Sequence, residues 1–494
     1  MLDLHMPVIV AAAQTNERDT DIEPMAALIS VVGDALAQSG AAGFLTNKVG
    51  SIRVLQGMWS YSDPGRLVAN AHSLGNVQTT LNPMGGNEAY DLVNTTAAEI
   101  QAGRIDVAIL CASESGRTSR RLRKLGERID RYVGADDSIP NLSYGDDRPM
   151  QEPQQTAVGA HLPVNFYALV ESAIGHSRGV TVESHRQHIA ALWAQASEVA
   201  AENRFAAIQQ PFTALEIATQ SLENRMIATP YTKLMTANLD VDMAAAIVMC
   251  SLGTARDAGI PDKNLVFISS GAGVSDHWSV NERWALNDSP AMKMAGSRAL
   301  ALSQRSVHEI DDLDLYSCFP SAVQLAQNYL GIEMDRQFTI TGGLTFAGGP
   351  LNSYCFHALA TAYERMVLGL SASAMLTGNG GYFSKHSATI LTAEAPKLGF
   401  LHERPQAEID AGPRRTRVRT TPSSATIETA TVTYKRDEGP NMAIISAIDI
   451  DGARHWASSV EGDVINAVLT SEVIGLTAQF SLNLDNTLNF DFRC

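Results

Sequence analysis

Cysteine is scarce in this chain, and its few copies show no pairing pattern. Five occur in 494 residues, at Cys111, Cys250, Cys318, Cys355 and Cys494. Spacing this irregular provides neither a disulfide framework nor the paired ligands of a zinc site. We therefore expect free thiols, no bound metal and a reducing cytoplasmic location.

Signals for export and for membrane insertion are missing as well. The N-terminus has no basic segment, and no run of about 18 uncharged apolar residues occurs. Positive charge is also in deficit, because 37 lysines and arginines face 53 acidic residues and the formal net charge is −16. Nucleic-acid binding depends on a basic face. We therefore expect no membrane span and no nucleic-acid partner.

Apolar sequence, in contrast, is abundant. Hydrophobic residues make up 45% of the chain, which is enough for a large core, and the length favours two or three domains.

Two segments, 85–115 and 348–381, read as copies of one unit. Each opens with a glycine pair, continues as an apolar-periodic helix and ends in a short apolar strand. This duplication predicts an α/β architecture built from two βαβ-rich halves. A helix that starts at Gly85-Gly86 or Gly348-Gly349 also offers free N–H groups, which favour negative charge.

The remaining patterns suggest three larger units: a first half at 1–256 with an insertion at about 117–230, a second half at 257–403, and a separate domain at 404–494. Residues 117–160 lack a sustained period and read as a lid or loop over the site. Residues 213–224 read as a helix. Short alternating runs after residue 405 predict a small β-barrel of OB type.

Several motifs resemble those of the thiolase superfamily, over about residues 5–400. The segment NTTAAEIQAGRIDVAILCASES at 94–115 is similar to the helix and strand after the thiolase nucleophile, and GGLTFAGGPL at 342–351 to the Gly-His-Pro segment. LTGNGG at 376–381 stands at the Cys-Xaa-Gly motif, and YSCF at 316–319 resembles the His-Asp-Cys-Phe motif of the sterol-carrier-protein-linked thiolases. The chain most resembles the thiolase-like proteins of type 1, which carry an additional C-terminal domain. The resemblance implies a duplicated, five-layer αβαβα fold.

The same resemblance implies that the usual catalytic side chains are replaced. The nucleophilic cysteine aligns with Gly86, the Gly-His-Pro histidine with Gly349, the second cysteine with Leu376, and the first histidine of His-Asp-Cys-Phe with Tyr316. Thiolysis needs a thiolate and two acid–base groups. We therefore do not expect ordinary thiolysis through a cysteine.

Backbone donors remain where the side chains are lost. In the family, one oxyanion hole uses main-chain N–H groups at positions that match Gly86 and Gly378, and such donors polarise a thioester carbonyl without a side chain. The alternative is that these glycines only allow close helix packing. Tyr316, Cys318 and His386 are the candidate reactive residues. Tyr316 acts as a base if its pKa is lowered, or else fills the space of a lost histidine. Cys318 is either a thiol in the pocket or a buried core residue. His386 is either an acid–base group or a histidine that caps the backbone.

Ligand binding is expected at two further places. Arg117, Arg120 and Arg121 are candidates for the phosphates of coenzyme A, or else form a solvated helix face. Gly349 is a candidate for the cofactor site through its place in the Gly-His-Pro alignment. Acyl-CoA is then a substrate, and no permanently bound cofactor is expected. The resemblance implies a homodimer, and a monomer stays open.

Three functions follow from these observations. The first is an atypical acyl-CoA acyltransferase of lipid metabolism, similar to acetyl-CoA acetyltransferases, that works through backbone oxyanion stabilisation. The second is a retro-aldol C–C lyase on a β-hydroxyacyl-CoA that uses Tyr316, as the resemblance to steroid side-chain aldolases with OB-fold partners implies. The third is a non-catalytic acyl-CoA or lipid-binding protein.

Overall fold

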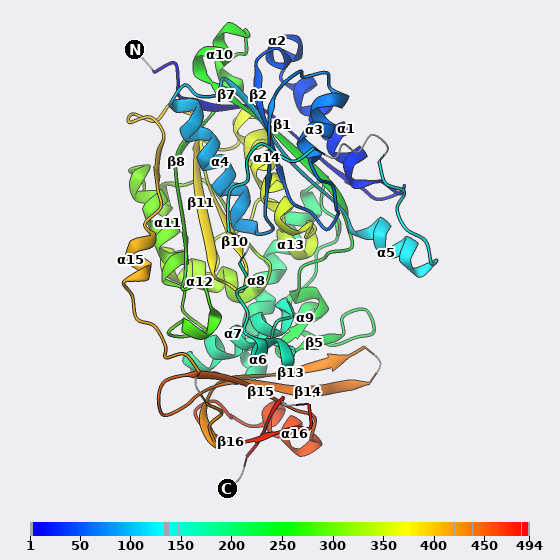
Figure 1. The fold of residues 1–494 in the computed structure, drawn as a ribbon, viewed down its shortest axis with the longest axis vertical. Helices are drawn as coiled ribbons and strands as arrows, with labels where there is room; N and C mark the ends of the chain where they lie inside the picture. Colours follow the sequence, from blue (N-terminus) through cyan, green and yellow to red (C-terminus); the bar gives the residue numbers. More distant parts are fainter. Residues whose placement is uncertain are drawn as a thin grey trace.

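The computed structural model describes residues 3–132, 138–146, 148–418, 420–436, 438–485 and 487–492. Cys494 lies outside these residues, and Cys111, Cys250, Cys318 and Cys355 are free thiols. The molecule is elongated, with a large α/β core at one end and a small β domain at the other (Figure 1).

The first half of the core is built on five strands in the order β3-β2-β4-β7-β1. Their bounds are β1 (Pro7–Glu17), β2 (Val49–Leu55), β3 (Gln78–Asn82), β4 (Val107–Ser115) and β7 (Asp242–Ser251). Strands β3, β2 and β4 are parallel, and β7 is antiparallel to both β4 and β1. Every residue of β4 and β7 is buried, which explains their near-continuous apolar sequence.

The second half repeats this arrangement with four strands in the order β8-β11-β10-β9. Their bounds are β8 (Val266–Ser275), β9 (Asp312–Asp314), β10 (Ser373–Gly380) and β11 (Lys385–Thr392). Strand β10 is parallel to β9 and antiparallel to β11, as β4 is to β2 and β7. The halves meet where β1 pairs with β8 at Val8–Phe267 and Ile9–Val266.

Helices form the other layers. Helices α4 (Gly86–Gln101) and α14 (Tyr354–Val367) lie in the middle: α4 packs on β10 and β11 of the second half, and α14 packs on β1 and β7 of the first. The outer layers are α1 (Pro24–Gln38) with α3 (Pro64–Ala71) on one side and α11 (Pro290–Leu302) with α12 (Pro320–Leu330) on the other (Figure 1). The duplicated five-layer α/β fold is therefore confirmed.

The second repeat differs from the prediction at its start. Helix α4 does begin at the glycine pair, with Gly85 as its N-cap. Helix α14 begins only at Tyr354, after the 3₁₀ turn η5 (Leu351–Ser353), so Gly349 does not lie at a helix N-terminus. Only the first glycine pair presents free helix N–H groups.

The inserted region is regular in part. Its first part is the helix α5 (Gly116–Lys124), which lines a cavity together with residues 126–129, and Leu142 lies beside β3. The helix expected at 213–224 is only α9 (Ala214–Ala218). It ends early because the side-chain amide of Asn224 donates to the carbonyls of Glu216, Ile217 and Thr219 and so caps the last turn.

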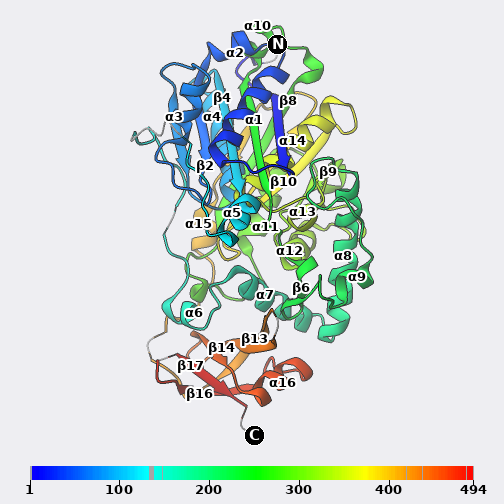
Figure 2. The same ribbon diagram turned by 90° about the vertical axis from the view of Figure 1, so that its right-hand side faces the viewer.

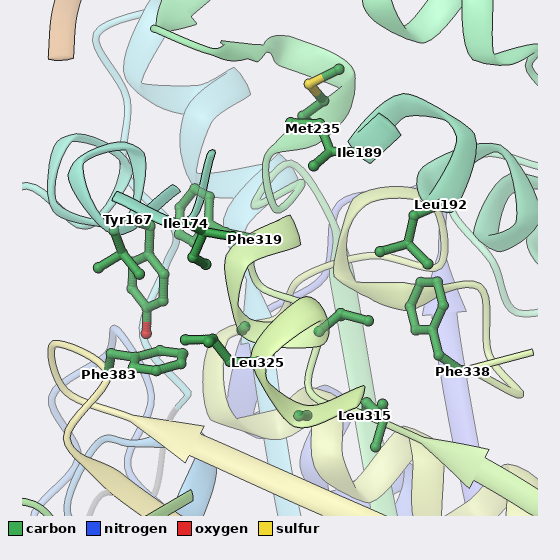
Figure 3. Close-up of a cluster of buried hydrophobic side chains, with 14 of the residues drawn as sticks. Tyr167, Ile174, Ile189, Leu192, Met235, Leu315, Phe319, Leu325, Phe338 and Phe383 are labelled. Carbon is green, nitrogen blue, oxygen red and sulfur yellow. The ribbon is translucent and has the colours of Figure 1, made fainter. Parts of the chain in front are cut away.

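Between the core and the C-terminal domain lie helices α7 (Pro163–Ser177) and α8 (Val182–Glu202) with the short α6 (Pro153–Ala157) (Figure 2). Their apolar faces meet α12 and the β10–β11 turn in one buried cluster. Figure 3 shows Tyr167 beside Phe319 and Phe383, with ring centroids at 4.6 and 5.8 Å. This packing fixes the position of the segments that line the site.

The C-terminal domain is an antiparallel sheet in the order β15-β14-β13-β16-β17. Its elements are β13 (Ser424–Lys435), β14 (Gly439–Ile448), β15 (Arg454–Ser459), α16 (Gly462–Thr470), β16 (Thr477–Leu482) and β17 (Leu488–Asp491). Strand β5 (Met226–Ala228) of the inserted region adds to β13. Buried Trp456 donates to the Asn281 side chain at 2.6 Å, so the domain docks against the helical insertion and the turn at 280–283.

The remaining short elements connect these parts. They are α2 (Ala42–Thr46), β6 (Tyr231–Thr232), η1 (Lys233–Met235), α10 (Leu252–Asp257), η2 (Asp262–Asn264), η3 (Val280–Glu282), η4 (Val307–Glu309), α13 (Gly343–Phe346), β12 (Leu401–Glu403) and α15 (Gln406–Asp410). No helix among the described residues is long and apolar enough to cross a membrane.

Candidate functional site

The start of α4 meets β10 and Tyr316 with no space for a side chain. A Cβ built on Gly86 would lie 2.5 Å from the Tyr316 ring and 2.5 Å from the Asn379 carbonyl oxygen. A Cβ built on Gly378 would lie 2.5 Å from the Gly86 carbonyl oxygen. Atoms do not approach this closely, so both positions require glycine. The structure thus brings together Gly86, Gly378 and Tyr316.

Backbone and hydroxyl groups at this junction are available for a ligand. Within the described residues, the Gly86 N–H donates no hydrogen bond, as is usual in the first turn of a helix. Tyr316 donates its backbone N–H to Thr377 Oγ1 at 3.0 Å, and no described residue bonds its hydroxyl. The junction therefore carries two free donors.

The surroundings of Tyr316 do not favour a base. Its ring packs edge-on against Tyr354, with centroids at 5.8 Å, and burial raises the pKa of Tyr316 well above its usual value. The condition for Tyr316 to act as a base, a lowered pKa, is therefore not met, because an apolar environment disfavours the phenolate. As a neutral phenol, Tyr316 is a hydrogen-bond donor.

Two thiols flank the same junction. Cys318 Sγ accepts from the Asn379 amide at 3.7 Å, and Cys355 donates from Sγ to the Gly86 carbonyl at 3.1 Å. Burial raises the pKa of Cys318 to about 12 and that of Cys355 well above its usual value. Neither thiol is a thiolate near neutral pH, so neither is an activated nucleophile.

His386 pairs with Asn379 across β11 and β10 and reaches a buried polar chain. Its Nε2 lies 3.0 Å from Ser289 Oγ, which donates to Asp276 Oδ2 at 2.5 Å. Burial, with a smaller effect of Arg283, lowers the pKa of His386 to about 3. The imidazole is therefore neutral at physiological pH.

These residues line a closed pocket. Tyr316, Gly378, Asn379 and His386 surround a cavity of about 20 Å³. That volume holds about one water molecule. The pocket in this conformation has no room for an acyl group.

The predicted arginines lie elsewhere and already have partners. Arg117 pairs with Asp242 at 2.8 Å, Arg120 with Asp240 at 3.3 Å, and Arg121 with Asp21. These three are therefore not the free phosphate ligands that the sequence suggested. The acids that pair with them are remote in sequence, which a local basic run cannot reveal.

A second and larger cavity, of about 860 Å³, contains two of the predicted residues, Arg120 and Gly349. Arg123 and Arg128 also line it, and neither forms an ion pair within the described residues. Its wall includes the aromatic rings of Trp59 and Tyr61. The cavity reaches Leu351 in η5, and η5 packs on α4, the helix that begins at Gly86.

Sequence reasoning missed a charged pair beside the first glycine pair. Glu88 and Lys385 are both buried, and Lys385 Nζ lies 3.5 Å from Glu88 Oε1. Burial, with the nearby Asp91, raises the pKa of Glu88 to about 7. An acidic residue in the first turn of a helix that starts at Gly-Gly was the available signal. Among the described residues, no group of histidine, cysteine or acidic side chains is arranged to hold a metal ion.

Comparisons with known proteins agree with this architecture. The family model of the thiolase-like protein type 1 additional C-terminal domain matches residues 405–483. The structure is similar to a monomeric SCP2-thiolase-like protein type 1 from Mycobacterium smegmatis, with a TM-score of 0.85, 27% sequence identity and 100% of both chains covered.

A more distant match is an Ltp2–ChsH2(DUF35) aldolase, with a TM-score of 0.60 and 18% identity over 80% of this chain and 99% of that one. Among the curated proteins, none matches this chain. The match of the C-terminal domain and the full-length structural match both support an assignment to the thiolase-like proteins of type 1.

Proposed function

We propose that the chain is an acyl-CoA-binding enzyme, an atypical acyltransferase that activates a thioester without forming an acyl-enzyme. The observation that carries this proposal is the Gly86 junction, where Tyr316 occupies the space next to a helix start that has no side chain. Both neighbouring thiols are held protonated. The junction therefore suits hydrogen-bond donation to an oxyanion better than nucleophilic attack.

Its chemistry would be the stabilisation of an enolate oxygen. The Gly86 N–H points from the positive end of α4, and the neutral Tyr316 hydroxyl is a second donor once its ring has rotated. His386 is a weak base because burial lowers its pKa to about 3, so it would relay the α-proton rather than hold it. As the ring takes this proton on one nitrogen, its Nε2–H would pass to Ser289 Oγ and the Ser289 hydroxyl proton to the Asp276 carboxylate, whose pKa burial raises.

Coenzyme A would bind in the larger cavity. Its volume of about 860 Å³ lies within the range of roughly 300–1,000 Å³ that is typical of small-molecule and cofactor pockets. Arg123 and Arg128 lack ion-pair partners among the described residues and can hold phosphate. The cavity wall at Gly349 and Leu351 leads towards the Gly86 junction, so the pantetheine arm would follow this wall.

Two other functions are compatible with the fold. A retro-aldol lyase acting on a β-hydroxyacyl-CoA is disfavoured because it needs Tyr316 as a base, whereas burial raises the pKa of Tyr316. A non-catalytic acyl-CoA or lipid-binding protein would use the same donors without turnover. We also infer that the C-terminal domain is an OB-type barrel. Along the chain α16 lies between the third strand, β15, and the fourth, β16, and β15 lies against β17, which closes the sheet β15-β14-β13-β16-β17.

The test measures binding and proton exchange separately. Calorimetry gives the Kd for acetyl-CoA and a longer acyl-CoA, and NMR in D2O follows exchange of their α-protons. We expect wild type to bind and exchange, Tyr316→Phe to bind with exchange strongly reduced, and the remote control Tyr434→Phe to match wild type. Binding without exchange would identify a binding protein, C–C cleavage of a β-hydroxyacyl-CoA would identify the lyase, and no binding would overturn the proposal.

A further inference from the structure

We propose that residues 141–143 cap the free edge of the large sheet and keep it from pairing with a second copy of this chain. Strand β3 is the outermost strand of the first half and has β2 on one side only. An outermost strand exposes backbone N–H and C=O groups that can pair with another chain. Natural sheets protect such strands with charged residues, proline or a covering loop.

The cap occupies the outer side of β3 with main-chain and side-chain bonds. Leu142 bridges Thr80 in parallel register, and its N–H donates to the Thr79 carbonyl at 3.2 Å. Asn141 Oδ1 accepts from the Thr79 N–H at 2.8 Å, and Ser143 Oγ donates to the Leu81 carbonyl at 3.1 Å. One donor and two acceptors of the edge are thus used by the chain itself.

The residue after the cap holds it in place. The Tyr144 hydroxyl donates to Glu99 Oε1 at 3.0 Å, and the Arg53 guanidinium lies 5.7 Å from the Tyr144 ring. Arg53 is buried and pairs with Glu99. The cap is therefore fixed to both β2 and α4.

The sequence of the strand itself does not block pairing. QTTLN at 78–82 contains neither charge nor proline, the usual blocks on an exposed edge. A second copy related by a twofold axis would present the same strand antiparallel, a self-complementary arrangement. With the cap displaced, such a pair would continue the sheet from one molecule into the next.

The experiment measures molar mass by light scattering on the full chain. Asn141→Ala with Leu142→Pro removes the side-chain acceptor and the backbone donor of the cap. We expect wild type at 53.0 kDa and the uncapped variant at twice that mass. Adding Gln78→Lys, a charge at an exposed position of β3, should return the uncapped variant to the monomer.

Matched controls carry the same two types of substitution at exposed positions away from the cap. Asn70→Ala lies on the exposed side of α3, and Ile450→Pro lies in an exposed turn. A dimeric wild type, or an uncapped variant that remains monomeric with an unchanged circular dichroism spectrum, would overturn the proposal. If the double variant does not fold, Asn141→Ala alone should speed exchange of the Thr79 amide about fivefold; unchanged exchange would also overturn it.

Discussion

Glu114, at the end of β4, allows a quantitative test of the burial pattern. Its side chain lies in the wall of the larger cavity, is 6% exposed and accepts one hydrogen bond, from the Met58 N–H at 2.9 Å. Burial raises the pKa of Glu114 from 4.5 to about 7. The folded protein therefore holds this proton over a pH range in which the unfolded chain has lost it.

The sign of the effect follows from that difference. Below pH 4.5 the carboxyl is protonated in both states, and between 4.5 and about 7 only the unfolded chain ionises. Stability then falls as pH rises. This pKa shift lowers the free energy of unfolding by about 3 kcal/mol once the pH exceeds the pKa of Glu114 in the folded protein.

Glu114→Gln keeps the acceptor for Met58 and removes the titration. We expect its free energy of unfolding, from urea titrations, to exceed that of wild type by about 3 kcal/mol at pH 8 relative to the difference at pH 4. Glu127→Gln, at the exposed mouth of the same cavity, controls for net charge. A difference between Glu114→Gln and wild type that does not change between pH 4 and pH 8 would refute the reasoning.

Two other substitutions test the packing of the site and of the C-terminal domain. Gly86→Ala should lower the free energy of unfolding in urea by about 1–3 kcal/mol, because its Cβ meets Tyr316 and the Asn379 backbone. The control Gly43→Ala, at a helical position in open space, should cost nothing. Equal stability of the two variants would contradict the geometry. Arg454→Met leaves Glu428 without its buried partner and removes bonds to the carbonyls of Val280 and Arg283. Arg454→Met should lower the free energy of unfolding by about 3–5 kcal/mol and speed proteolytic release of the C-terminal domain. The control Arg417→Met, which breaks the ion pair of the exposed Arg417 with Glu282, should lower it by at most about 1 kcal/mol. Similar proteolysis of the two variants would argue against a docking role for Arg454.

Local pattern was sufficient for much of the core. The short apolar strand expected at the end of the first repeat is β4, because a strand buried on both faces carries apolar residues at nearly every position. The pair Gly85-Gly86 marked a helix start, because glycine tolerates the N-cap conformation, here with φ 154°.

Long-range contacts explain what the sequence did not reveal. The raised pKa of Tyr316 comes from burial against elements that are distant along the chain. The partners of Arg117 and Arg121, Asp242 and Asp21, lie about a hundred residues away in opposite directions. Periodicity describes which face of an element is apolar, and it cannot identify which charged groups meet.

The central claim is that the chain activates an acyl-CoA without a covalent intermediate. Intact-mass spectrometry of the full chain, sampled from milliseconds to minutes with acetyl-CoA while NMR follows α-proton exchange in the same buffer, tests it directly. The account predicts exchange with no acylated protein at any time, because the thiols of Cys318 and Cys355 stay protonated. An acyl adduct on either cysteine that forms and decays at the rate of turnover would contradict it.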